Sequence, residues 1–270
     1  MSYKSLIVAV TDAEVGARAL AQAAALAARH DAHLTALYVY EPPYYRYPVA
    51  YPEIIQVDPE AARGEDAATL AVRDAFQASC RAEGVEKYEW RFVRGERLHV
   101  LALHARYVDA LVMAQGDLAA QVAIASPRPV IAVPAEASER APGRRIMLAW
   151  NTSREATRAA TAALPLMAEA ERVWVLTIDA ATGDWRGHGA EPGADIALYL
   201  ARHGIEAEVR QVDSDTDGVA DTLITEAIEM NADLLCMGAY GHSRLRELVL
   251  GGVSREVMRG PLPMSVLMAH

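Results

Sequence analysis

Cysteine and lysine are scarce in this sequence of 270 residues, and each scarcity excludes a class of protein. The two cysteines, Cys80 and Cys236, lie in apolar segments, so we expect core residues and no disulfide framework. Free thiols fit a reducing compartment, and we expect a cytoplasmic protein. The two lysines are Lys4 and Lys87, and no Gly-x4-Gly-Lys-Ser/Thr motif occurs. A P-loop nucleotide hydrolase is therefore excluded.

The sequence also lacks long hydrophobic runs and an excess of positive charge. No run of about eighteen apolar residues is present, which argues against a membrane-spanning helix. The formal net charge is −10, whereas binding to nucleic acid or to an anionic membrane needs a basic surface. We therefore expect no nucleic acid and no membrane as partner. A small anion held by backbone amides remains compatible with this charge.

The chain contains an internal repeat. Short apolar segments recur in the same order in both halves, which is the pattern of a duplicated unit. The corresponding pairs are 5–12 with 145–151, 33–40 with 172–179, 109–113 with 233–237, and 129–133 with 263–267. We expect a polar linker over 135–144 and two domains, 1–138 and 144–270. For the Tyr/Pro-rich insert at 41–52, a lid, a contact surface and a cover for a sheet edge remain open.

Within each half, apolar strands alternate with Ala-rich helices, as in a parallel sheet covered on both faces. We expect an α/β fold with two doubly wound units, each having five parallel strands and four helices. Ser153 is expected to cap a helix that follows it. A helix over 222–230 is expected to leave Glu226 and Glu229 on the side that faces water.

The most unusual stretch starts at Met237 and contains Gly238 and Gly241, followed by Gly251 and Gly252. It follows an expected buried strand and precedes an expected helix. Glycines let the backbone approach a phosphate, and the helix offers N–H groups and the positive end of its dipole. In open α/β sheets the ligand crevice lies at the carboxyl ends of the strands, where this segment falls. Spacing alone leaves open a helix stop at Gly241 and a tight turn at Gly251 and Gly252.

The spacing Gly238-x2-Gly241-x9-Gly251 resembles the nucleotide-binding signature of the universal stress protein family. The run 232–238 and the closing segment 261–267 are similar to that family as well. The resemblance covers nearly the whole chain as two tandem domains. It implies a Rossmann-like fold, similar to the adenine nucleotide alpha hydrolases, in each domain. It also implies that the second domain binds ATP or AMP, with or without Mg²⁺.

Carried over residue by residue, the resemblance implies one site in the second domain. Ala149 and Asn151 would lie near the ribose and phosphates, and Ile178 would offer its backbone to the adenine. The remaining expected site residues are Met237, Gly238 and Gly241 on the ribose-phosphate side, and Gly251, Gly252, Val253 and Ser254 around the phosphates. On this basis, valine at position 238 or 251 is expected to abolish binding without unfolding the chain.

Two residues depart from the family pattern. Nucleotide binders of the family usually carry Asp where Asn151 stands and Ser or Thr where Gly252 stands. The first difference weakens Mg²⁺ coordination, and the second removes a hydroxyl. The first half keeps Asp12, but the short segment 114–118 follows its strand in place of the glycine-rich one. We expect this half to bind nucleotide weakly or not at all. No metal site is expected, because in the acidic turn after Asp213 the position of a bidentate Glu is Ile224.

Besides a genuine nucleotide hydrolase or transferase, two classes of function remain open. The first is a stress-response protein that binds an adenine nucleotide and hydrolyses it slowly at most, with no catalytic residue assigned. The second is a stress adaptor without nucleotide, acting through protein contacts or another small ligand. The last strands of the halves, 130–133 and 266–268, are expected to meet about a pseudo-twofold axis, which makes an intramolecular domain pair. The family uses this edge for dimers, so a homodimer is expected too.

Overall fold

A computed structural model describes residues 2–10, 13–42, 66–138, 140–180, 191, 193–216, 218–239 and 252–270, with the backbone alone at 13–15. Nearly all of the Tyr/Pro-rich insert, and with it the question of its role, lies outside the described residues. No helix in the described part combines the length and apolar character that crossing a bilayer requires.

All described strands belong to one sheet of ten strands in the order β3-β2-β1-β4-β5-β10-β9-β6-β7-β8. Every neighbouring pair is parallel except β5 and β10, which confirms the expected α/β fold of two five-stranded halves. The strands of the first half are β1 (Ser5–Val10), β2 (His33–Tyr40), β3 (Tyr88–Arg94), β4 (Ala110–Ala114) and β5 (Val130–Val133). Those of the second half are β6 (Arg145–Ala149), β7 (Arg172–Ile178), β8 (Glu208–Val212), β9 (Leu234–Gly238) and β10 (Ser265–Ala269).

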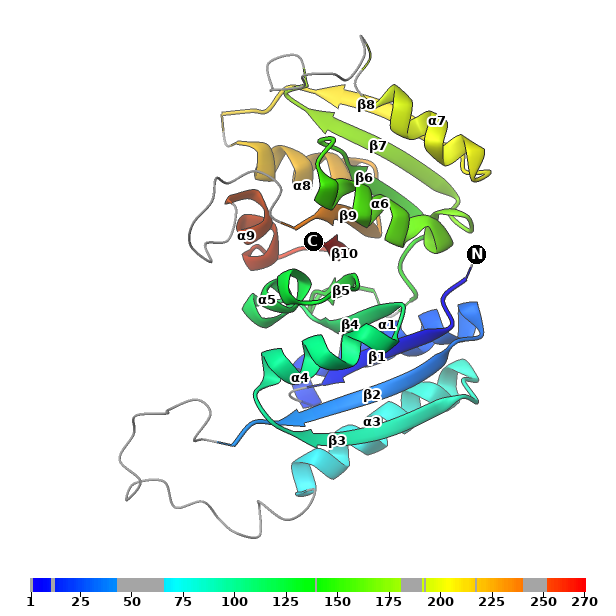
Figure 1. The fold of residues 1–270 in the computed structure, drawn as a ribbon, viewed down its shortest axis with the longest axis vertical. Coiled ribbons are helices and arrows are strands. Elements are labelled where there is room, and N and C mark those ends of the chain that lie inside the picture. Colours follow the sequence, from blue (N-terminus) through cyan, green and yellow to red (C-terminus); the bar gives the residue numbers. More distant parts are fainter. Residues whose placement is uncertain are drawn as a thin grey trace, which may run out of the picture.

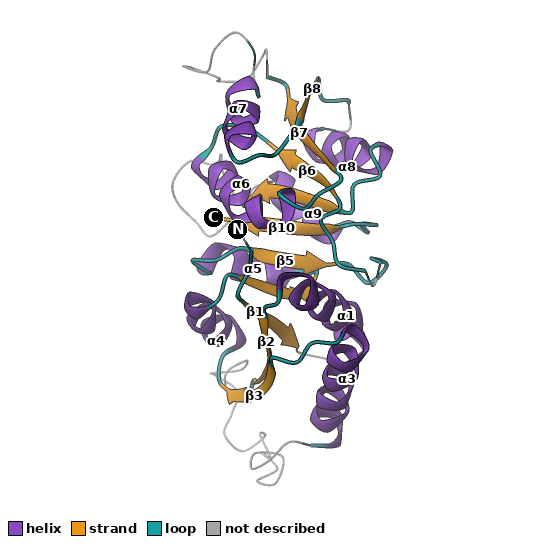
Figure 2. Ribbon diagram, turned by 90° about the vertical axis from the view of Figure 1, so that its right-hand side faces the viewer, coloured by secondary structure: helices purple, strands orange, loops and turns teal. Residues whose placement is uncertain are grey.

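Helices cover both faces of the sheet along its whole length (Figure 2). One face carries α1 (Ala13–His30), α3 (Ala67–Glu83), α6 (Arg154–Met167) and α7 (Ala194–Arg202). The other face carries α4 (Arg97–His104), α5 (Asp117–Ala125), α8 (Val219–Glu229) and α9 (Gly252–Arg259), with the short 3-10 turn η1 (Ala105–Tyr107) after α4. The inner strands are buried along their length because helices lie over both of their faces, so their apolar residues do not alternate with polar ones.

The two halves meet at β5 and β10 in the middle of the molecule (Figure 1). The pair is antiparallel, with Leu267 opposite Ile131 and Met268 opposite Val130, so the expected pairing of the last strands is confirmed. Both hydrophobic clusters, one on each face of the sheet, contain residues of both halves. The joint is therefore a continuous core, and it removes an open strand edge from each half.

Polar contacts also cross the joint. The side-chain oxygen of Gln22 on α1 accepts a hydrogen bond from the hydroxyl of Ser265 at 2.7 Å, and its amide nitrogen donates to the carbonyl of Ser138 at 2.6 Å. The hydroxyl of Tyr3 donates to the carbonyl of Ala162 on α6 at 2.8 Å. Within the segment 135–144, Ala137, Pro142 and Gly143 are buried, and Ala137 is 3% exposed. The domain boundaries, 1–138 and 144–270, stay a prediction.

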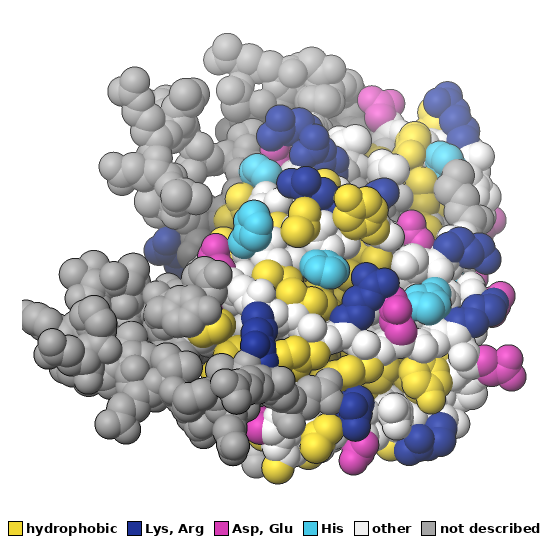
Figure 3. Space-filling view, turned by 60° about the horizontal axis from the view of Figure 1, so that its bottom comes forward, with side chains coloured by type: hydrophobic (Ala, Val, Ile, Leu, Met, Phe, Trp, Pro, Cys, Tyr) yellow, Lys and Arg dark blue, Asp and Glu magenta, His cyan; other side chains and the backbone are white. Residues whose placement is uncertain are grey.

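The outer edges of the sheet are β3 and β8, which carry charged side chains on exposed or half-buried positions. Such charges discourage pairing with a further strand. Seen from the end of the first half (Figure 3), hydrophobic side chains are interleaved with cationic, acidic and histidine side chains.

Two local expectations have different outcomes. The hydroxyl of Ser153 accepts the N–H of Ala156 at 3.1 Å and caps α6, as predicted. The expectation that Glu226 faces water is wrong, because the guanidinium of Arg210 on β8 binds its carboxylate and leaves it 12% exposed. Only Glu229 of the two glutamates is exposed.

Candidate functional site

The strand-end residues expected in the site, Ala149, Ile178, Met237 and Gly238, lie at the carboxyl edge of the second half. Strands β9, β6 and β7 are neighbours and run parallel, so their carboxyl ends share one edge. Because Ile146 pairs with Leu234, Ala149 lies level with Met237 at this edge. The chain leaves β6 toward β7 on one side and returns to β9 on the other, so β6 and β9 mark the switch point of the sheet. In open parallel sheets such a switch point is where ligands bind.

The strand ends contribute mainly main-chain groups to this edge, because their side chains are largely buried. Met237 is 5% exposed and packs into the core under α8 and α9. Ile178 is half-buried, and the next residue, Asp179, donates its N–H to the carbonyl of Val212 at 3.0 Å. The Asp179 carboxylate accepts the N–H of Ser214 at 2.7 Å, which holds its pKa below the usual range. This aspartate therefore organises the β7 and β8 ends.

Asn151 belongs to the turn that starts α6. Its side-chain oxygen accepts hydrogen bonds from the N–H of Ser153 at 3.2 Å and from the hydroxyl of Ser153 at 2.7 Å. Thr152, between them, has a φ of +61°, in the left-handed region. The Ser153 hydroxyl in turn accepts from Ala156. Asn151 is exposed at the edge, but its oxygen is engaged in shaping the helix start.

The first turn of α6 holds a buried carboxylate. The side chain of Glu155 is 9% exposed and is bound by Arg154 at 2.9 Å. Burial raises its pKa, but the hydrogen bond from its own backbone N–H, the Arg154 guanidinium and the His270 charge together hold the pKa below its usual range. An anionic Glu155 therefore already occupies the positive end of the α6 dipole.

Gly238 is a glycine because α6 lies against it. A Cβ built on Gly238 would stand 2.6 Å from the backbone nitrogen of Ala156 and 2.7 Å from the carbonyl carbon of Glu155. Both neighbours are backbone, so they move only if the helix moves. We therefore expect valine here to displace α6 and to destabilise the fold, in place of the expectation from the sequence that it affects binding alone. Packing of the helix is a sufficient reason for this glycine.

The start of α9 is different. Gly252 is exposed, and a Cβ built on it would meet no atom of the described residues within 4 Å. Val253 is half-buried, and Ser254 is 4% exposed. The first N–H groups of a helix have no partner inside the helix and attract anions. The other expected residues of this loop, Gly241 and Gly251, lie outside the described residues.

The matching segment of the first half is used for packing. After β4, residues 115–116 lead directly into α5. The amide nitrogen of Gln115 donates to the carbonyls of Val257, Met258 and Gly260 at 3.0–3.1 Å, at the carboxyl end of α9. The first half therefore caps the helix whose other end faces the candidate site.

Sequence reasoning missed Glu155 and Gln115. For Glu155 a signal exists, since a carboxylate in the first turn of a capped helix favours the helix dipole. Its burial depends on β9, which the local pattern does not show. Gln115 contacts residues about 142 positions away in the chain, so no local signal points to its role. Asp12, expected at the first-half edge, lies outside the described residues.

Comparisons with known proteins agree with this fold. The sequence profile of the universal stress protein family matches residues 2–134 and 143–269. A universal stress protein structure from Archaeoglobus fulgidus is 16% identical over 97% of this chain and 95% of its own, with a TM-score of 0.69. A putative universal stress protein from Pseudomonas aeruginosa is 16% identical over 99% of this chain and 93% of its own, with a TM-score of 0.61. No curated protein is similar enough to this chain to count as a match.

Proposed function

Because this chain belongs to the universal stress protein family, we propose that it is a stress-response protein that binds an adenine nucleotide, ATP or AMP, in its second half. The observation that carries the proposal is the contrast between two helix starts at one sheet edge. The start of α6 holds the buried anion Glu155, whereas α9 starts at the exposed, sterically open Gly252. A phosphate is repelled by the first and attracted by the second.

The proposed site keeps the residues named from the sequence. Ala149, Asn151 and Ile178 would frame the ribose and adenine at the ends of β6 and β7. The phosphates would be held by Gly252, Val253 and Ser254 at the start of α9, with Met237 and Gly238 below and Gly241 and Gly251 in the preceding loop. Main-chain groups do most of the binding in this arrangement, which suits a protein with an acidic surface.

Protein ligands for Mg²⁺ fit this edge poorly. The Asn151 oxygen is engaged by Ser153, and among the described residues no group of three or more His, Cys, Asp or Glu side chains is arranged to hold a metal. We infer that any Mg²⁺ would enter on the phosphates of the nucleotide. Hydrolysis would be slow, because the lowered pKa of the Glu155 carboxyl makes it a weak general base.

An adaptor without nucleotide is the second candidate, and two observations favour it. The Asn151 side-chain oxygen accepts hydrogen bonds within the turn that starts α6, which is a sufficient reason for this residue. The close packing of α6 is a sufficient reason for the absence of a side chain at Gly238. Both features would persist in a domain that had lost its ligand. The two candidates differ in one measurable property, which is whether a nucleotide raises the melting temperature of the chain.

A matched pair of variants at Gly252 tests the site. Aspartate at this position has room and suits a helix start, so Gly252→Asp should fold normally and repel phosphate, lowering ATP affinity roughly tenfold or more. Gly252→Asn has the same shape without the charge and should retain binding. Calorimetry with ATP and AMP, and nucleotide extracted from the purified protein, supply the readouts. Equal affinity in both variants would mean that the phosphates lie elsewhere, and no binding by the natural chain would favour the adaptor.

Quaternary structure follows from the same fold. In the family, the strand edge at this position mediates dimers. In this chain, β5 and β10 pair with each other at that edge. We propose that the two halves replace the family dimer, and that a homodimer of the whole chain, if formed, uses another surface. Sedimentation at several protein concentrations measures this directly. We also propose a cytoplasmic location, in keeping with the buried free thiols of Cys80 and Cys236.

A further inference from the structure

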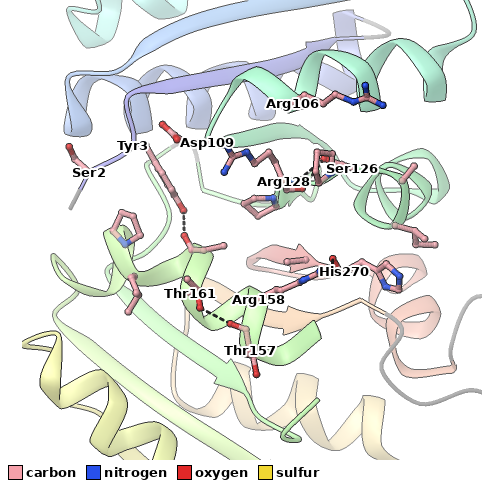
Figure 4. A pocket seen from close by; sticks show the side chains of 18 of the residues that line it. Ser2, Tyr3, Arg106, Asp109, Ser126, Arg128, Thr157, Arg158, Thr161 and His270 are labelled. Carbon is pink, nitrogen blue, oxygen red and sulfur yellow. Dashed lines mark hydrogen bonds between the residues drawn. The ribbon is translucent and has the colours of Figure 1, made fainter. Parts of the chain in front are cut away.

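A large groove lies between the two halves. Its volume is about 1070 Å³, and it is lined by the N-terminal segment, the end of α5, the amino end of β5, α6, α7 and the carboxyl end of β10. Figure 4 shows Arg128 from the first half and Arg158 from the second half as parts of its wall. This size is sufficient for a small organic ligand.

The charge of the groove is opposite to that of the protein. Three arginines line it, namely Arg106, Arg128 and Arg158, against one side-chain carboxylate, that of Asp109. The Asp109 carboxylate is engaged by the backbone N–H groups of Lys4 at 2.6 Å and Ser5 at 3.0 Å. A cationic groove on a chain of net charge −10 marks a local preference for anions.

The arginines retain donors for a ligand. Within the described part of the chain, neither Arg106 nor Arg128 forms an ion pair with a carboxylate. Arg158 donates one N–H to the carbonyl of His270, and its guanidinium has further donors. Guanidinium groups bind phosphate and carboxylate oxygens with two parallel hydrogen bonds, so these side chains suit a compact oxyanion.

The rest of the wall favours an apolar ligand body. Leu164, Pro165 and Tyr199 on α6 and α7 line it, together with Ile124 and Pro127 from the first half. The nearby hydroxyl of Thr161 donates to the carbonyl of Thr157, four residues earlier in α6 (Figure 4), and is thus not a donor to an anion. Binding of the charged group therefore falls to the arginines.

We propose that this groove binds an organic phosphate monoester, with the phosphate between Arg128 and Arg158 and the apolar body against α6 and α7. A dianionic phosphate suits cations on two walls better than a carboxylate does. Because the two arginines come from different halves, the ligand ties the halves together. None of the described residues of the nucleotide site proposed for the second half lines the groove, so the two proposals involve different residues.

Phenyl phosphate is a suitable probe, because it joins one phosphate to one apolar ring. Isothermal calorimetry should show saturable binding to one site, with weaker binding of benzoate and none of phenol. Arg128→Gln and Arg158→Gln should each weaken phenyl phosphate binding roughly tenfold, because each removes a charged hydrogen-bonding group. Arg81→Gln, which removes an exposed arginine on α3 at the same cost in charge, should leave the affinity unchanged.

Three results would overturn the proposal. They are the absence of saturable binding, equal weakening by Arg81→Gln, and loss of phenyl phosphate binding in Gly252→Asp with no loss in Arg128→Gln. The last would place the probe at the start of α9. Failure of the nucleotide proposal has a different signature, since ATP would then fail to bind while phenyl phosphate still responded to Arg128 and Arg158.

Discussion

The carboxyl edges of the two halves end the same kind of strand in different ways. After β4 the chain enters α5 through residues 115–116, whereas after β9 it reaches α9 only beyond residues 239–251. In the first half the short connection places Gln115 on the carboxyl end of α9. In the second half α9 starts at Gly252, which is exposed. The comparison teaches that the two copies of a duplicated fold can contribute differently to one helix. The first half binds the carboxyl end of α9, and the amino end of α9 is exposed in the second half.

The same comparison extends to the strand ends and the helices over them. In the alignment of the repeat, Ala114 corresponds to Gly238, and Gly16 on α1 corresponds to Glu155 on α6. The second half thus has the smaller residue on its strand and the larger one on its helix. Glu155 closes over the strand end, and no room for a side chain remains at Gly238.

The largest effect is expected from Gly238→Val. The new side chain would meet the α6 backbone at Ala156, so the helix must shift, and the free energy of unfolding should fall by about 3 kcal/mol. Denaturation by urea measures this. The matched control is Ala114→Val, at the corresponding strand end of the first half, which should cost much less because a Cβ is already accommodated there. Equal losses would show that the two edges are packed alike.

The next effect concerns the cap on α9. Gln115→Leu leaves carbonyls of Val257, Met258 and Gly260 without their donor, and this should lower the free energy of unfolding by roughly 2 kcal/mol. Hydrogen exchange in α9 should become faster at the same time. Gln121→Leu, on the exposed side of α5, is the control and should change neither quantity. An unchanged α9 in Gln115→Leu would mean that the first half does not hold this helix.

The fold is more predictable from the sequence than the site, for physical reasons visible in these residues. Buried parallel strands need unbroken apolar runs, and the duplication repeats those runs in order, so strand number, strand type and the β5–β10 joint all follow from the pattern. The edge where Ala149, Ile178 and Met237 meet follows as well, because parallel strands end together. What Asn151 and Gly238 do there does not follow, since their contacts depend on where α6 is placed. Contacts between halves, such as that of Gln115, carry no local periodicity at all.

A buried histidine at the joint gives a prediction for pH. His30, at the end of α1, has a fully buried side chain, an edge-on contact with the Tyr3 ring, and no hydrogen-bond partner among the described residues for either ring nitrogen. Burial lowers its pKa, while the Glu169 carboxylate, 3.8 Å away, opposes this in part, and Arg29 and Lys4 lower it further.

The sign of the pH effect follows from that lowered pKa. The unfolded chain binds a proton at His30 more readily than the folded chain, so this contribution to stability is complete above about pH 6.5 and is lost as pH falls through the folded pKa. His30→Phe should remove this part of the dependence below about pH 6.5, whereas the exposed control His99→Gln should retain it. Identical pH profiles for the natural chain and His30→Phe would show that the joint tolerates the charge.

The smallest expected effect is that of Glu155→Gln on nucleotide affinity. Removing the buried anion beside Gly238 takes away a repulsive charge at the proposed site, so ATP should bind about threefold more tightly, with a larger gain for ATP than for AMP because ATP carries more charge. Glu206→Gln, an exposed change before the amino end of β8, is the control for net charge and should have little effect. Raising the salt concentration should reduce the difference between the two variants. Weaker ATP binding in Glu155→Gln would mean that this carboxylate supports the ligand, and the contrast between the two helix starts would then have to be abandoned.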